Sequence, residues 1–205
     1  MDRPGQAPGS RLLHRAGILR AVSTPTLAGR LSALWGLIGV EAVLVHPQTS
    51  LMPLAWEALR SDLQPIHFAF LAVWVPFMLW SEGYRGFHCK FSPRTAARAG
   101  HLMHNPTWRH GLLAPLYAMA LLHARRSTFI ARVVLLTGIV GLIVGVQQLP
   151  APWRGLVDVG VVLGLGWGAL SLAWHGTLTL LGKPPEFDLA LPGSVAPPRK
   201  SRWPR

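Results

Sequence analysis

The sequence predicts an all-α, polytopic membrane protein with four transmembrane helices and one short interfacial or re-entrant helix. Composition supports this class, because half of the 205 residues are hydrophobic and only 14% are charged, against about 25% charged in typical soluble domains. The apolar residues also gather in long runs, and in lipid such runs form helices, which satisfy their own backbone hydrogen bonds. Finally, most basic residues fall between these runs. A net charge of +12 distributed in this way indicates membrane orientation and not nucleic-acid binding.

Four runs approach the roughly 20 residues that cross about 30 Å of hydrocarbon at 1.5 Å per residue. These predicted spans are 26–46, 63–80, 129–149 and 156–181. Together they define a membrane domain, 26–181, that follows a basic N-terminal segment, 1–25. That segment has no apolar core with a cleavage site, so we expect it to be retained. The proline-rich basic tail, 182–205, is expected to be disordered.

A fifth apolar run, 112–124, is short for a span. If it stays on the cytoplasmic side, 18 of the 20 Lys and Arg residues lie inside, and only Arg60 and Arg154 lie outside. If the run crosses the membrane, the split becomes nearly even, so the orientation rule favours the first topology. We therefore expect a cytoplasmic segment, 81–128, with short helices at 93–103 and 108–124 and with both termini in the cytoplasm. A short true span is the alternative.

Glycines recur on the predicted third and fourth spans. Three of them stand four residues apart on the fourth span, and this spacing lets another helix backbone approach closely. Because a short turn joins the two spans, we expect the two glycine faces to pack on each other; the alternative is a groove for a partner helix or a cofactor ring. The predicted helix-packing residues are Gly138, Gly141, Gly145, Gly160, Gly164 and Gly168.

Two acidic residues fall within predicted spans. Glu41 and Asp158 are both predicted toward the outer face, and His46 and His67 at a similar depth. An ionisable residue in lipid is costly and therefore indicates an ion or proton path or a paired contact. Alternatively, Asp158 caps its helix and the two histidines are merely interfacial.

Histidines are frequent in the segment 81–128 and raise the possibility of a metal site. His101 and His104 share one helix face, and His88 with the only cysteine, Cys89, could add ligands. No second paired motif accompanies them, so the signal is weak. A single cysteine excludes a disulfide framework within the chain. The residues imply no particular cofactor; a haem between His46 and His67 is the pairing that their depth would permit.

The stretch "SEGYRGFHCKFSPR", 81–94, is predicted to be a turn on the membrane surface. Its glycines suit a helix end, its aromatic residues suit the headgroup layer, and Ser92-Pro93 resembles a helix start. Basic residues here and after the short run are expected to reach lipid headgroups. These residues are Arg85, Lys90, Arg94, Arg98, Arg125 and Arg126.

The motifs "EGYRGF" and "FSPR", with "QLPAPWRG" later in the chain, resemble a pattern in small uncharacterised bacterial inner-membrane proteins. The resemblance covers 82–94 and 148–155. It implies a bacterial inner-membrane location and carries over no catalytic residue.

No nucleophile motif, phosphate loop or dinucleotide fingerprint is present in the sequence. The leading hypothesis is a non-catalytic subunit or accessory protein that packs against partner helices or against its own copies in the bilayer. The second is a small ion- or proton-coupled transporter or channel that uses Glu41 and Asp158. The third is a membrane metalloenzyme that uses the cytoplasmic histidines.

Overall fold

The computed structural model describes residues 25–105, 111–121, 130, 134, 137, 141 and 144–185. These residues form an all-helical structure and contain no strand, which confirms the predicted class for this part of the chain. The helices are α2 (Leu27–Arg60), α3 (Pro65–Met78), η1 (Leu79–Phe91), α4 (Ser92–His104), α6 (Ala114–Ala118) and α8 (Trp153–Leu180).

Helix α2 runs 34 residues and continues well past the expected end at His46. Pro47 and Pro53 lie inside it without ending it. Local side chains bond to backbone carbonyls near the first of these prolines, with Gln48 donating to the Leu44 carbonyl and Thr49 to that of His46.

Helices α3, η1 and α4 follow one another without a break and form a single helical stretch, Pro65–His104, of 40 residues. The surface turn expected at 81–94 is therefore wrong. Gly83 and Gly86 keep helical conformations, and Ser92 makes no capping hydrogen bond. The backbone of η1 is π-helical. This wider winding explains how Pro93 is accommodated, since a proline ring clashes with the carbonyl four residues earlier in an α-helix.

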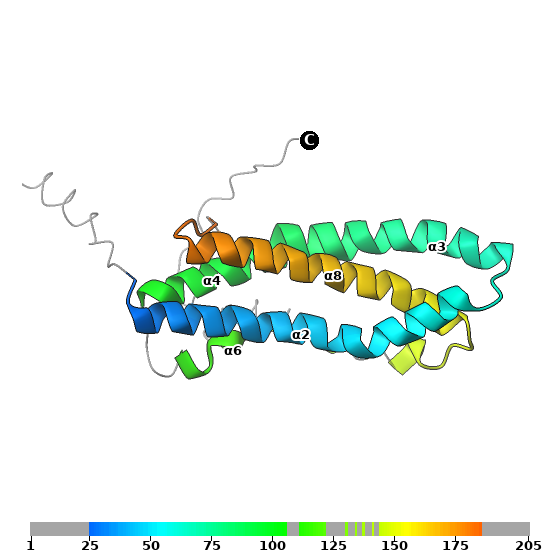
Figure 1. The fold of residues 1–205 in the computed structure, drawn as a ribbon, viewed down its shortest axis with the longest axis horizontal. Helices are drawn as coiled ribbons and strands as arrows, with labels where there is room; N and C mark the ends of the chain where they lie inside the picture. Colours follow the sequence, from blue (N-terminus) through cyan, green and yellow to red (C-terminus); the bar gives the residue numbers. More distant parts are fainter. Residues whose placement is uncertain are drawn as a thin grey trace, which may run out of the picture.

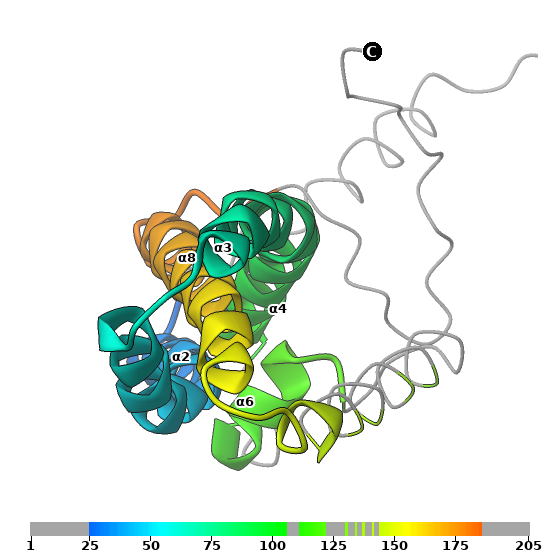
Figure 2. The same cartoon turned by 90° about the vertical axis from the view of Figure 1, so that its right-hand side faces the viewer.

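The three long helices pack as an elongated bundle (Figure 1). Helix α8 runs antiparallel to α2 and parallel to the 65–104 stretch, and it contacts both along its length. The view along the bundle shows α8 beside α2 and α3 (Figure 2). At about 1.5 Å per residue the three helices are roughly 50, 60 and 40 Å long. Each is longer than the hydrocarbon layer of about 30 Å.

The two ends of the bundle differ in charge. At one end the starts of α3 and α8 meet, with His67 packed on Trp153, and Arg60 and Arg154 lie nearby. At the other end Gly29 meets Met103, and Gly100 packs against Thr179 and Pro184. The exposed basic residues near this second end, called the α4 end below, are Arg30, Arg94 and Lys183.

The largest apolar core lies toward the α4 end. Its α2 face consists of Ala33, Leu37, Val40 and Leu44, which pack with Ala99 and Met103 of α4, Ala118 of α6 and Leu172 of α8. Short helix α6 packs on α2, where Gly36 and Gly39 leave room for Ala114 and Pro115. Only 111–121 of the expected helix 108–124 is described, and its placement in a membrane stays a prediction.

Three described stretches are long and apolar enough to cross a membrane: Leu27–Arg60, Pro65–His104 and Trp153–Leu180. They correspond to the first, second and fourth predicted spans. About half of the third predicted span, 129–149, falls outside the described residues. The terminal segments, 1–24 and 186–205, also lie outside them.

Candidate functional site

Helix α8 presents its glycines to the 65–104 stretch. Gly160 receives the indole of Trp74 and the side chain of Met78, and Gly168 receives the ring of Phe87. Between them Gly164 lies under the carboxylate of Glu82, whose Oε2 is 3.3 Å from the position a Cβ would take. A side chain at any of these positions would push the neighbouring helix away. The glycines therefore set the close approach of these helices.

The expected packing of this glycine face on a second glycine face is not what the structure contains. Gly141 and Gly145 are exposed, and no described atom lies within 4 Å of the Cβ position of either. Gly138 lies outside the described residues. Side chains of the 65–104 stretch fill the spaces that the glycines of α8 leave. The helices therefore pack side chain against glycine, and not glycine face against glycine face.

Asp158 is a buried carboxylate near the start of α8. Its side chain is 4% exposed, and its Oδ2 atom has no hydrogen-bond partner. Gly155, three residues earlier, contacts Leu54 and Ala58 of α2, which puts Asp158 close to the α2-facing side of α8. Arg154, one turn before, is the basic residue that interacts electrostatically with it. An unbonded carboxylate in this setting is costly to keep ionised.

The other three residues expected at the depth of Asp158 are spread along the bundle. His67 is near that depth; it is buried against Trp153 and accepts a hydrogen bond from the Gln64 N–H at 3.0 Å. Glu41 is half-buried, and His46 is exposed. Because α2 continues to Arg60, both lie roughly 20 Å or more from its end. The predicted common level, and with it a haem between His46 and His67, is therefore wrong.

Two histidines and one serine meet where η1 packs on α8. His88 Nδ1 is 3.0 Å from Ser171 Oγ. His175 Nδ1 donates to the Ser171 carbonyl at 2.8 Å and lies 3.5 Å from Ser171 Oγ. The two imidazole rings stand edge to face with 5.2 Å between centroids. Ser171 is buried, whereas both histidines are half-buried.

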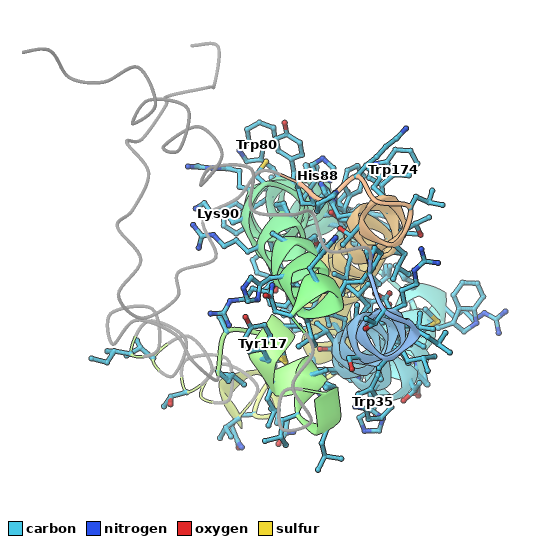
Figure 3. All side chains as sticks on the ribbon, turned by 90° about the vertical axis from the view of Figure 1, so that its left-hand side faces the viewer. Trp35, Trp80, His88, Lys90, Tyr117 and Trp174 are labelled. Atoms are coloured by element: carbon cyan, nitrogen blue, oxygen red, sulfur yellow. The ribbon has the colours of Figure 1, made fainter. Side chains whose placement is uncertain are left out.

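Aromatic rings surround this histidine–serine cluster. Trp80 stacks on Tyr84, and Tyr84 stacks on His88, at centroid distances of 5.2 and 5.7 Å. Figure 3 shows Trp80, His88 and Trp174 on the same side of the bundle. Neither Ser171 nor His175 was among the predicted site residues. The signal for them was their spacing of four residues, which places two polar groups on one face of an otherwise apolar span.

A second polar cluster joins α4 to α6. Arg98 is 1% exposed, donates to the Tyr117 carbonyl at 2.6 Å and lies 4.9 Å from the centre of the Tyr117 ring. The Tyr117 hydroxyl is 3.0 Å from His101 Nδ1. Burial raises the pKa of Tyr117, and the charge of Arg98 partly offsets that increase. The cluster ties α6 to the long helix (Figure 3).

These contacts disperse the predicted metal ligands. His88 turns toward α8, His101 bonds Tyr117, and His104 donates to the Gly100 carbonyl at 3.1 Å. Across the described ranges no three His, Cys, Asp or Glu side chains are placed to hold a metal ion. Cys89 is a half-buried free thiol. Within the described ranges the structure does not bring His88, Cys89, His101 and His104 together into one site.

The residues predicted to contact lipid headgroups differ in where the structure places them. Arg85, Lys90 and Arg94 are exposed, as that prediction requires, but Arg98 points into the protein and binds α6. Two more, Arg125 and Arg126, lie outside the described residues. Ser92 and Thr95, next to this region, bury hydroxyl oxygens that have no hydrogen-bond partner.

No family model, curated protein or solved structure matches this chain. The class therefore comes from the fold itself. An all-helical bundle with three membrane-length apolar helices indicates a polytopic α-helical membrane protein. The resemblance to small bacterial inner-membrane proteins stays a prediction.

Proposed function

We propose that this chain is a small integral membrane protein that moves a proton or a monovalent cation across the bilayer along α8. The observation that carries the proposal is Asp158, a carboxylate buried within a candidate membrane span, whose Oδ2 atom has no hydrogen-bond partner among the described residues. Ionisable residues inside membrane helices are costly, and those that persist usually bind or pass an ion.

Polar groups lie along α8 at three levels. Asp158 is near its start, the Glu82 carboxylate lies over Gly164, and Ser171 bonds His88 farther along. The distance from Asp158 to Ser171 is about 20 Å along the helix axis, which is most of the hydrocarbon thickness. Asp158 lies close to the α2 side of α8, and Glu82 and Ser171 lie on its η1 side, so the proposed path passes from one side of the helix to the other.

The charge difference between the ends supports an orientation. Exposed basic residues gather near the α4 end, and positively charged ends of bacterial inner-membrane proteins face the cytoplasm. The proposal therefore places the α4 end in the cytoplasm and the Arg60 and Arg154 end outside. Four spans with a re-entrant 112–124 segment, and a bacterial inner membrane, complete the proposed topology.

Purified protein in liposomes tests this function. With a membrane potential imposed and pH or Na⁺ gradients varied separately, wild-type protein should support flux of one of the two cations. Asp158→Asn should lower that flux at least about tenfold, since the amide cannot exchange a proton or neutralise a cation. Glu57→Gln, at an exposed acidic position of α2, is the matched control and should keep wild-type flux. Equal flux in wild type and Asp158→Asn would refute the proposal.

A second candidate is the non-catalytic subunit that packs against a partner helix. Gly141 and Gly145 favour it, because they stand four residues apart and are exposed. Gentle detergent purification tests this role. A second membrane protein or a second copy should co-purify with the wild type and be lost with Gly145→Leu. Recovery of the chain alone in both cases would contradict it.

A further inference from the structure

We propose that His88, Ser171 and His175 form a relay that passes one proton between two imidazoles, which makes the proton the transported species. This inference rests on the proposed function, which leaves the choice between a proton and a metal cation open. The cluster lies on the η1 side of α8, whereas Asp158 lies close to the α2 side.

The hydrogen bonds assign the resting protons. A carbonyl oxygen only accepts, so His175 Nδ1 carries a hydrogen that it donates to the Ser171 carbonyl. Ser171 Oγ lies 3.5 Å from His175 Nδ1, which is close enough for this oxygen to be a second acceptor of the same N–H. The Ser171 hydroxyl is then left to donate to His88 Nδ1 at 3.0 Å, which makes that nitrogen an acceptor and puts the proton of neutral His88 on Nε2.

The transfer step follows from this order of donors. When His175 takes up a proton at Nε2, it becomes an imidazolium. Its Nδ1–H bond then breaks as Ser171 Oγ takes that proton, and the Ser171 O–H bond breaks as His88 Nδ1 takes the hydroxyl proton. The positive charge moves from His175 to His88, and Ser171 is restored. The step leaves neutral His175 with its proton on Nε2, and the Ser171 carbonyl, 2.8 Å from His175 Nδ1, favours the tautomer that carries this proton on Nδ1 instead.

Only one of the two imidazoles can hold the extra proton at a time. Their ring centres are 5.2 Å apart, and two positive charges at that distance in a half-buried site repel each other. The relay therefore carries one proton at a time. Tyr84 stacks on His88, and Glu82 lies on the same interface at Gly164.

The neighbouring helices add few titratable groups. The α2 residues that pack with Leu172 are apolar, and Glu41 is the half-buried acidic residue on that stretch of α2. From α4 the nearest polar side chain in sequence is Ser92, which does not titrate. Glu82 and Glu41 are therefore the acidic residues that the neighbouring helices contribute around a proton on this cluster.

The geometry also argues against a metal cation as the species bound here. Both Nδ1 atoms are occupied by bonds to Ser171, and the described residues supply no third ligand to the pair. Proton transfer requires an uninterrupted chain of hydrogen-bond donors and acceptors, and a hydroxyl between two imidazoles provides such a chain.

Two measurements test the relay, and the first does not depend on transport. Protein with ¹⁵N-labelled histidine in lipid nanodiscs should show by NMR a Nδ1–H tautomer for neutral His175 and a Nε2–H tautomer for neutral His88. Opposite tautomers would overturn the relay even if Asp158 proves essential for transport.

The second measurement is proton flux in liposomes. Ser171→Ala should lower it about 100-fold, a loss typical of removing a positioned proton-transfer group. Ser171→Thr, which keeps the hydroxyl, should retain most of it. Thr177→Ala is the matched control, since this exposed hydroxyl of α8 only donates to the Ala173 carbonyl. If Ser171→Ala does not fold, His88→Gln replaces it, because glutamine can accept the Ser171 bond and cannot take up the proton.

The outcomes separate the two proposals. Loss of flux in Asp158→Asn with wild-type flux in Ser171→Ala would refute the relay and keep the transport function. Sodium flux without proton flux would also refute the relay. Absence of any flux in wild type would refute the transport function, and the NMR tautomers would then decide whether the hydrogen-bonded cluster exists as described.

Discussion

The indole N–H of Trp74 donates a hydrogen bond to the Val157 carbonyl at 3.0 Å. The ring reaches that carbonyl because Gly160, within the next turn of α8, has no side chain. The indole N–H of an apolar helix thus bonds to the backbone of a neighbouring helix. Interhelical bonds of this kind add to packing in lipid, where apolar side chains gain little from leaving the solvent.

Replacing Gly160 should break this contact. In Gly160→Val the new side chain would overlap Trp74 and approach Met78 Cγ, which is 2.9 Å from the Cβ position. We expect a loss of about 1–3 kcal/mol in stability, as for other overpacked sites, measured by tryptophan fluorescence during thermal unfolding in detergent. Gly145→Val, at an exposed position, is the control and should change stability little. Equal effects of the two variants would count against the packing described.

Removing the buried carboxylate should stabilise the protein. Asp158 has no hydrogen bond at Oδ2 to lose, and a leucine at this position would bury apolar surface instead. Asp158→Leu should raise stability by about 1–3 kcal/mol, as when functional polar groups are replaced by apolar ones. The same thermal measurement checks this, with the exposed Glu57→Leu as comparison. A clear loss of stability in Asp158→Leu would show that the carboxylate has a structural role.

Arg98 should be needed to hold α6 in place. Arg98→Ala removes a charged hydrogen bond to the Tyr117 carbonyl and a contact with its ring. The expected cost is about 2–4 kcal/mol, the sum of ordinary values for these two interactions. Hydrogen exchange should rise first in 114–118. Lys90→Ala, at an exposed basic position of η1, should leave exchange there unchanged. Unchanged exchange in Arg98→Ala would contradict the cluster.

The sequence predicted the helical class, and its fourth span, 156–181, differs from α8 by three residues at the start and one at the end. Long apolar runs and their charged borders determine these features directly. It failed at 81–94, where each local signal favoured a turn. Gly83 fits closely against Trp167, and the π-helical winding accommodates Pro93. Both facts depend on contacts between distant parts of the chain, which local patterns do not contain. For the same reason Arg98 was assigned to lipid headgroups and Ser171 was missed.

Stability should fall at high pH through Tyr117. Burial raises the pKa of this hydroxyl in the folded state, so the folded state holds the proton more tightly than the unfolded state does. The protonated Tyr117 hydroxyl contributes its full stabilisation below the unfolded-state pKa of about 10. This contribution is lost as the pH rises through the folded-state pKa. Thermal midpoints from pH 8 to 11.5 should therefore fall less steeply in Tyr117→Phe than in wild type.

Tyr84→Phe provides the comparison for that titration. It removes the chain's other tyrosine and keeps Tyr117, so the loss due to Tyr117 should remain. If Tyr117→Phe has the same alkaline slope as wild type, the buried hydroxyl does not contribute to the pH dependence.

The histidine–serine cluster and the position of Glu82 over Gly164 depend on the 81–92 stretch being helical and lying on α8. A disulfide between cysteines introduced at Gly83 and Trp167 measures this placement most directly, because a Cβ on Gly83 would lie 3.1 Å from the Trp167 Cβ. In a Cys89→Ser background, mild oxidation in native membranes should link the pair efficiently. Gly83→Cys with Leu170→Cys, whose position is 75% exposed, should not link. Failure of the first pair to form a disulfide, with both cysteines reactive toward maleimide, would contradict the packing and restore the surface turn.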